Sequence, residues 1–325
     1  MNVREITITK LIKSRPFALL LMIAAAVAAF ASSLIASDAR PLISAHMELL
    51  QFHQLSQSAT VGLCMALNAV VIVVMSLING QFNLLRTTSW LFLAMWMMSQ
   101  LGTPDAMTHA VTGLCATLGM LACIWICVSI YQQPGQTKRV FLLFFIITCL
   151  GCCNYAYLAY LPVFLAGLVQ MRAVSLRSLL AAGVGIAVPV WLLWAFSVVD
   201  FTTVAAPQFD ITTMAIIKAN PTTSIAMAFT VVTGLIMMSA NLVKVYGYNA
   251  MTRAHNGLLL LVWLVTAILC VFGFGNLWAT LPLLNCTTAF QTGMFFRIYT
   301  RQRAYLPVII MITVYTALYI LTLWI

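Results

Sequence analysis

The residues in this chain that could do chemistry are a few carboxylates, histidines and cations between long apolar runs. Asp38 and Arg40 directly follow the first apolar run. Asp105 and His109 lie four residues apart in a later short polar stretch, and Lys218 lies in another. A carboxylate can accept a proton from a hydroxyl group, and a cation can hold a phosphate. Chemistry on a lipid phosphate at a membrane surface requires such a set of side chains.

Several of these residues also have a plainer interpretation. Pro41 predicts the first turn of a short helix that continues over 42–56, and His46 and His53 fall on its apolar side. These two histidines either bind substrate or carry protons, or they pack against a neighbouring helix through one hydrogen-bonded nitrogen. Asp105 either takes part in catalysis or caps the N-terminus of the helix that follows it.

The composition indicates a membrane protein. Hydrophobic residues make up 63% of the 325 residues and charged residues only 7%, whereas about a quarter of the residues of a soluble protein are charged. The net charge of +10 comes from cations scattered singly between apolar runs. A nucleic-acid partner would need a basic run that this chain lacks. The expected partner is therefore the lipid bilayer.

Eleven apolar runs predict an all-α protein with about eleven transmembrane helices in a single membrane domain over 1–325. They lie at 16–36, 57–78, 87–102, 107–130, 139–153, 155–171, 178–198, 223–243, 256–274, 277–296 and 304–324. The first run resembles a signal peptide, but ten more runs follow it, so we interpret it as an uncleaved span. A span needs about twenty residues. The runs 87–102, 139–153 and 155–171 are shorter, and the last two either span twice or form one re-entrant hairpin.

The charged residues sort by the side of the membrane on which these spans would place them. Fourteen of the sixteen cations share one side with Glu5: Arg4, Lys10, Lys13, Arg15, Arg86, Lys138, Arg139, Arg172, Arg177, Lys244, Arg253, Arg297, Arg301 and Arg303. The other side carries two cations and five acids: Arg40, Lys218, Asp38, Glu48, Asp105, Asp200 and Asp210. Because cytoplasmic loops carry the excess of cations, we expect the N-terminus in the cytoplasm and the C-terminus outside.

The membrane interior contains polar residues but no charge. No predicted span has a Lys, Arg, Asp or Glu near its middle. Ion-driven transporters keep such costly residues because they need them, so the sequence argues against a proton- or sodium-driven transporter. Asn68, Asn154 and Asn241 either hydrogen-bond to neighbouring helices or line a pathway.

The sequence indicates no cofactor and no metal site. The nine cysteines lie mostly inside apolar runs, where cysteine packs as a small hydrophobic residue. The Cys149-x-x-Cys152 motif has no second cysteine pair or histidine nearby for zinc. His255 falls on the opposite side of the membrane from the other three histidines, so the four imidazoles cannot converge on one metal.

The stretch from Lys138 to Val190 carries a resemblance to a known family. A short apolar run reaches Cys153-Asn-Tyr-Ala-Tyr157, a second opens at Ala159-Tyr-Leu-Pro162, and a basic loop and a longer span follow. This layout resembles the short-hairpin region of polytopic glycosyltransferases that use polyprenyl-phosphate sugars, the C-type fold. The chain as a whole, with its Asn79-Gly-Gln-Phe-Asn-Leu-Leu85 turn, also resembles an uncharacterised family of inner-membrane proteins from Bacteroidota.

The first resemblance implies roles for residues on the outer side. In those glycosyltransferases a catalytic Asp or Glu follows the first span, and Asp38 occupies that place. Asp38 would then act as general base on an acceptor hydroxyl, while Arg40 or Lys218 holds the lipid phosphate. Asp105 would orient the acceptor or hold a divalent ion, and His109 would belong to the substrate-binding side chains. The sugar would pass from an undecaprenyl-phosphate carrier to a glycan, lipid or protein outside the cell.

Two other functions fit the same sequence. One is a non-catalytic subunit or scaffold of an envelope-assembly or secretion complex, which the sorted charges and the lack of diagnostic motifs also suit. The other is a transporter of a lipid or small molecule that is not coupled to ions. A cavity around Asp38 that opens to the bilayer and the outer water would favour the enzyme.

Overall fold

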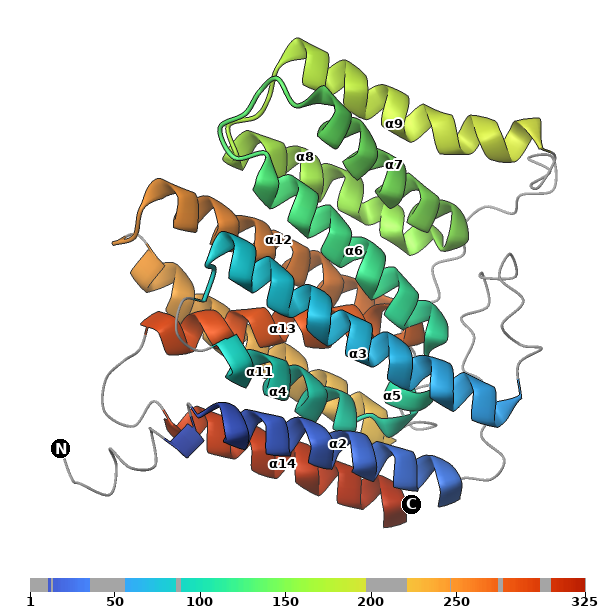
Figure 1. Cartoon of the computed structure of the whole chain (residues 1–325), viewed down its shortest axis with the longest axis vertical. Coiled ribbons are helices and arrows are strands. Elements are labelled where there is room, and N and C mark those ends of the chain that lie inside the picture. The colour runs from blue at the N-terminus through green and yellow to red at the C-terminus, as the bar shows by residue number, and fades with distance from the viewer. Residues whose placement is uncertain are drawn as a thin grey trace.

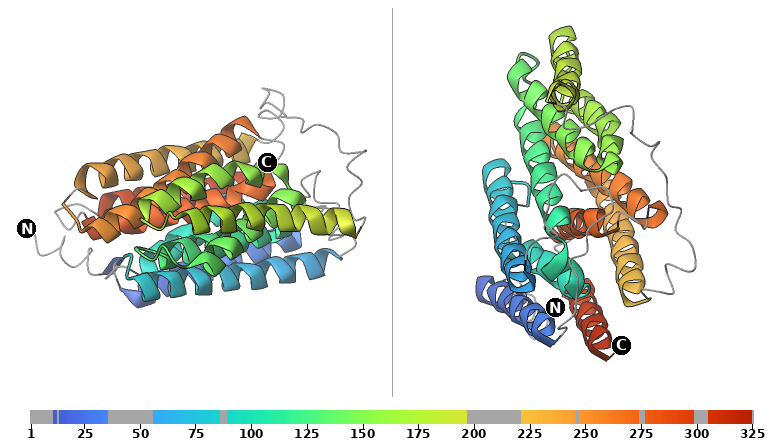
Figure 2. Two further views of the ribbon diagram at one scale, coloured as in Figure 1. Left: turned by 90° about the horizontal axis from the view of Figure 1, so that it is seen from above. Right: turned by 90° about the vertical axis from the view of Figure 1, so that its right-hand side faces the viewer.

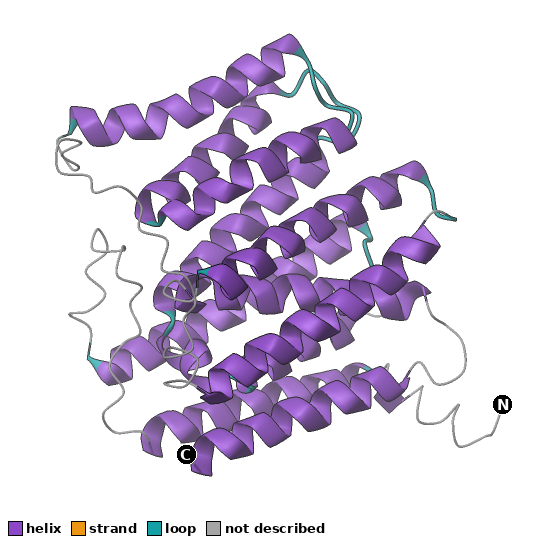
Figure 3. Ribbon diagram, turned by 180° about the vertical axis from the view of Figure 1, so that it is seen from behind, coloured by secondary structure: helices purple, strands orange, loops and turns teal. Residues whose placement is uncertain are grey.

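The computed structural model describes residues 11–12, 14–35, 56–85, 89–196, 221–245, 247–273, 277–298 and 305–324. These residues form helices joined by loops, without strands (Figure 1, Figure 3). The elements are α2 (Arg15–Ile35), α3 (Gln57–Phe82), α4 (Ser89–Leu101), α5 (Pro104–His109), α6 (Val111–Ser129), α7 (Thr137–Cys153), the 3-10 helix η2 (Tyr155–Ala159), α8 (Tyr160–Gln170), α9 (Leu176–Ala195), α11 (Pro221–Val245), α12 (Ala250–Phe272), α13 (Leu277–Ile298) and α14 (Tyr305–Trp324). The predicted all-α fold is confirmed over this part of the chain.

Seven of the described helices are long and apolar enough to cross a membrane, namely α2, α3, α6, α9, α11, α12 and α14. Hydrocarbon offers no partner to backbone N–H and C=O groups, so a helix that satisfies them internally is the structure that such apolar runs adopt in a membrane. Large apolar side chains are exposed on the outward faces of these helices, as Leu180 and Trp194 are on α9. Lipid, rather than water, suits so extensive an apolar surface.

The remaining helices are shorter or more polar. The three runs predicted to be short correspond to α4 with 13 residues, α7 with 17 residues, and η2 followed by α8. The last predicted span but one corresponds to α13, which has 22 residues but does not qualify as a span because it carries many polar side chains.

Local signals explain where several helices begin and end. The Ser56 side chain accepts a hydrogen bond from the Ala59 N–H and so caps α3. Asn83 ends the same helix with a φ of 50°, in the left-handed region that asparagine tolerates better than most residues. Ser175 and Ser178 form a reciprocal capping box at the start of α9.

Helix α13 lies at the centre of the bundle. It packs against α4, α6, α11 and α12, and nearly all of its side chains from 277 to 296 are buried. Helices α7 and α9 lie together at one end of the long axis, and α2 and α14 lie at the other (Figure 1, Figure 2). A helix in the α13 position meets protein on every side, which allows it to carry polar groups that lipid would not accept.

Glycines allow two of the helix pairs to approach closely. A Cβ atom on Gly113 of α6 would collide with the main-chain oxygen of Trp278 in α13. A Cβ atom on Gly185 of α9 would lie 2.7 Å from the main-chain oxygen of Phe141 in α7. Small residues are common where membrane helices meet because they let the backbones come together.

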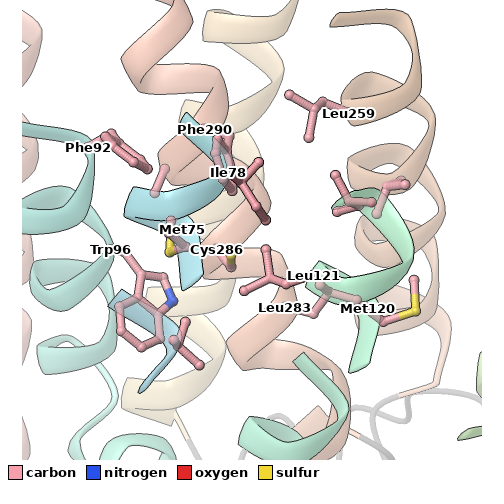
Figure 4. Close-up of a cluster of buried hydrophobic side chains, with 14 of the residues drawn as sticks. Met75, Ile78, Phe92, Trp96, Met120, Leu121, Leu259, Leu283, Cys286 and Phe290 are labelled. Atoms are coloured by element: carbon pink, nitrogen blue, oxygen red, sulfur yellow. The ribbon is translucent and has the colours of Figure 1, made fainter. Parts of the chain in front are cut away.

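Side chains from α3, α4, α6, α12 and α13 fill the core around the central helix (Figure 4). The labelled residues are Met75, Ile78, Phe92, Trp96, Met120, Leu121, Leu259, Leu283, Cys286 and Phe290. The rings of Phe92 and Phe290 lie 5.3 Å apart between centroids and join α4 to α13. This contact keeps the central helix in register with α4.

The charged residues of the described segments lie at the ends of the bundle. Cations occur at the start of α2, the start of α7, the α8–α9 turn, the end of α11 and the start of α12: Arg15, Lys138, Arg139, Arg172, Arg177, Lys244 and Arg253. These helix ends lie together on the left of Figure 1, and α5 with Asp105 lies towards the opposite end. Within the described segments, the middle of the bundle therefore contains no charged side chain.

Candidate functional site

Two of the seven predicted site residues, Asp105 and His109, lie in the described structure, and both belong to α5. The other five lie outside the described residues: Asp38, Arg40, His46, His53 and Lys218. The predicted helix over 42–56 also lies outside them, except for its last residue, Ser56, which is the N-cap of α3. The geometry of the predicted outer site is therefore that of α5 and its neighbours.

Helix α5 is a short element between α4 and α6. Pro104 is its first residue and Thr103 is its N-cap residue, which makes no side-chain capping bond. The alternative prediction that Asp105 caps the fourth span is wrong, because Asp105 lies in the first turn of this separate helix. Proline favours the first helical position because its fixed φ angle suits a helix and its missing N–H would have no partner there.

Asp105 and His109 differ in their surroundings. The Asp105 side chain is exposed, although the surrounding protein partly desolvates its carboxyl group and raises its pKa. His109 is only 3% exposed. Burial lowers the pKa of the His109 imidazole, and the nearby Asp105 opposes that shift. At neutral pH the pair thus consists of an accessible carboxyl group and an uncharged, buried imidazole.

The hydrogen bonds of Thr108 fix one nitrogen of the His109 ring. The Thr108 hydroxyl donates to the Pro104 carbonyl oxygen at 2.9 Å and lies 2.7 Å from Nδ1 of His109. A hydroxyl group has one hydrogen, so in this arrangement Nδ1 carries the proton and donates it to the Thr108 oxygen. The Nε2 atom then has a free lone pair, and it is buried without a hydrogen-bond partner among the described residues.

A second polar region, which the sequence did not predict, surrounds α13. Nδ2 of Asn285 in α13 donates to Oε1 of Gln100 in α4 at 3.1 Å. Nδ2 of Asn241 in α11 donates to Oε1 of Gln291 in α13 at 2.9 Å, and it also lies 3.0 Å from the Gln291 main-chain oxygen. We call Gln100, Asn241, Asn285 and Gln291 the amide cluster. Its two pairs lie on different sides of the central helix, since one faces α4 and the other faces α11.

Each member of the amide cluster keeps one atom without a partner. Within the described part of the chain, Nε2 of Gln100 and of Gln291 has no hydrogen-bond acceptor, and Oδ1 of Asn241 and of Asn285 has no donor. Nε1 of Trp96, one helical turn before Gln100 on α4, is also buried without a partner. Leaving a buried polar group without a hydrogen bond costs about 1–3 kcal/mol. Five such atoms lie on α4, α11 and α13, and each of them can form a further hydrogen bond with a partner.

The sequence contained a partial signal for this region. Asn285, Gln291 and four threonines place six uncharged polar side chains in the run over 277–296. Asn241 was a candidate either for helix contacts or for a pathway, and its bond to Gln291 confirms the helix contact. Asn68 likewise bonds from α3 to the Met107 carbonyl oxygen of α5 at 3.0 Å. Asn154 instead caps η2, because its Oδ1 accepts from the Ala156 N–H at 3.0 Å.

The other candidate ligands are dispersed. Within the described segments, no three His, Cys, Asp or Glu side chains lie close enough to hold a metal ion. All nine cysteines are free thiols. The Cys149 and Cys152 pair lies on α7, in the hairpin with α8.

The fold and these sites define a multi-pass α-helical membrane protein with uncharged polar groups at its centre. Seven candidate spans and an apolar outer surface support that class. No protein-family model, no curated protein and no solved structure matches the chain. Its function must therefore be argued from the sites themselves.

Proposed function

We propose that the chain is an eleven-span protein of the bacterial inner membrane, with its N-terminus in the cytoplasm and its C-terminus outside. Each of the eleven apolar runs overlaps a helix in the structure. The described cations gather at one end of the bundle, away from Asp105. Cytoplasmic loops are enriched in Lys and Arg, so the α5 end would face outwards and the cationic end would face the cytoplasm.

The proposed activity is a step of cell-envelope assembly at the outer end of this bundle. There a glycosyltransferase-like enzyme would transfer a sugar from a polyprenyl-phosphate carrier to an acceptor hydroxyl group. The single observation that supports this activity is the exposed Asp105 carboxyl group beside His109, whose buried Nε2 atom has no partner among the residues that the structure describes. Asp38 would be the general base, Asp105 would orient the acceptor, and Arg40 or Lys218 would hold the phosphate.

The test replaces the carboxylates one at a time in cells that lack the natural gene. Asp38→Asn and Asp105→Asn should abolish or strongly reduce the glycan that the protein makes, with normal amounts of protein in the membrane. Asp210→Asn is the matched control, because Asp210 is a carboxylate of the same predicted side without an assigned role. Mass spectrometry of lipid-linked and surface glycans provides the readout. Normal glycans in both Asp38→Asn and Asp105→Asn cells would overturn the enzyme proposal.

The amide cluster favours a second candidate function, a transporter of an uncharged polar molecule that is not driven by ions. Its side chains lie inside the bundle, between helices that carry no described charge near their middles. A transporter with this lining would move its substrate equally well with or without a proton or sodium gradient. Uptake by proteoliposomes that persists when both gradients are collapsed would separate this function from the enzyme.

A further inference from the structure

We propose that the Gln100–Asn285 pair between α4 and α13, together with Trp96 of α4, is a binding site for an uncharged group that carries several hydroxyls, such as a sugar ring. This proposal does not depend on the glycosyltransferase activity, because it concerns different residues in the middle of the bundle. It rests on the unpartnered atoms of the cluster and on the absence of described charge around them.

The unpartnered atoms give the chemistry of the ligand. Gln100 and Trp96 present N–H donors, and Asn285 presents a carbonyl acceptor. These three side chains are at most 1% exposed, so bulk water does not satisfy them. A hydroxyl group both donates and accepts, and a ring with several hydroxyls could meet donors and acceptors together.

The charge of the surroundings limits the ligand further. Helices α4, α6 and α14 carry no Lys, Arg, Asp or Glu, and the single cations of α11 and α12 lie in a terminal turn. An ionised phosphate or an ammonium group placed among the amides would lose its hydration without gaining a counter-charge. The ligand group at this site is therefore neutral, and any phosphate of a lipid carrier would lie elsewhere.

The apolar neighbours of the cluster fit the less polar faces of such a ring. Trp96, Met75 and Cys286 belong to the same cluster of buried apolar side chains (Figure 4). Small-molecule sites combine apolar and aromatic walls with a few placed polar groups. Because these side chains are enclosed, the proposal requires that α4 separates from α13 when the ligand enters.

Water and a sugar share the hydroxyl chemistry that this site requires, and an experiment can separate them. The probe is octyl β-D-glucoside, titrated below its micellar concentration onto the protein in lipid nanodiscs. The comparison compound is tetraethylene glycol octyl ether, which has the same apolar tail but mostly ether oxygens that cannot donate. The measured quantity is the midpoint of thermal unfolding.

The glucoside should raise the midpoint in a saturable way, and the ether should not. The double variant Gln100→Leu/Asn285→Leu should lose the glucoside effect, while Thr313→Val, on the exposed face of α14, should keep it. Both amides are replaced together so that neither remains buried alone. Trp96→Phe, which removes the unpartnered N–H donor of α4, is a second variant, should the first fail to fold. Equal effects of the two compounds, or a glucoside effect that survives in these variants, would overturn the proposal and leave water as the partner of the amides.

Discussion

The side-chain amide of Asn285 in α13 donates a hydrogen bond to the side-chain oxygen of Gln100 in α4, with 3.1 Å between the two atoms. The two residues that this bond joins are 185 positions apart in the chain. It uses one polar atom of each side chain, and the other atom of each has no partner among the described residues. The pair thus contributes to helix packing and also presents an unpaired donor and an unpaired acceptor inside the bundle.

Breaking this pair from one side should destabilise the protein more than removing it entirely. Asn285→Ala would leave the whole Gln100 amide buried without a partner, at a cost of about 1–3 kcal/mol. Gln100→Leu/Asn285→Leu should cost less than the two single changes added together. A double-mutant cycle on the free energy of unfolding in bicelles measures the coupling, which we expect at about 0.5–2 kcal/mol. Additive effects would show that the two side chains do not interact.

The contact between α6 and α13 predicts a strong effect of substituting Gly113. Gly113→Leu would force a side chain against the main-chain oxygen of Trp278 and separate the helices, at a cost of about 1–3 kcal/mol for an overpacked core. Gly62→Ala in α3 is the matched control, because a Cβ atom there would meet no atom within 4 Å. We expect that control to be neutral or slightly stabilising, since alanine favours a helix over glycine. Thermal unfolding in nanodiscs compares the two, and equal stability of both variants would contradict this packing.

Because His109 is buried, we predict that its contribution to the free energy of unfolding decreases in acid. Its pKa lies below the ordinary value of 6.5 in the folded state, so the unfolded chain binds the proton more readily. The contribution of His109 is therefore present above pH 6.5 and is lost as the pH falls from 6.5 towards the lower folded-state pKa. The raised pKa of Asp105 works in the opposite direction.

The matched variant for this effect is His109→Gln, which keeps Asp105 and all other titrating groups. The free energy of unfolding of the natural protein minus that of the variant should decrease between pH 7.5 and pH 5.5. Denaturant unfolding in mild detergent at a series of pH values measures this difference. A difference that stays constant, or that increases on acidification, would contradict the buried neutral imidazole.

The helices could be predicted from the sequence because the transfer free energies of successive apolar residues into lipid add up. An apolar run has a favourable transfer free energy whatever its neighbours are, so α3, α9 and α14 could be predicted from composition alone. The interruption at α5 was harder to predict. The run over 107–130 begins within α5, and the break falls at Ala110, where the sequence has no Gly or Pro to predict it.

The sequence predicted the candidate site less completely. Carboxylates and histidines can be recognised as candidate site residues one at a time, whereas the amide cluster forms only where particular helices meet. Gln100 and Asn285 are far apart in the chain, and only the tertiary structure brings them within hydrogen-bond distance. A central helix with unusual polarity, here α13, was the available signal for a buried polar site.

The central claim of this account is that the α5 end of the bundle faces outwards and the cationic end faces the cytoplasm. Single-cysteine labelling tests it most directly. Asp105→Cys and Lys138→Cys are exposed to a membrane-impermeant maleimide in intact spheroplasts and after lysis. The unsubstituted chain provides the background, because its nine cysteines lie within helices and are buried or half-buried. We predict that Asp105→Cys labels in intact spheroplasts and that Lys138→Cys labels only after lysis; the reverse pattern would contradict the account.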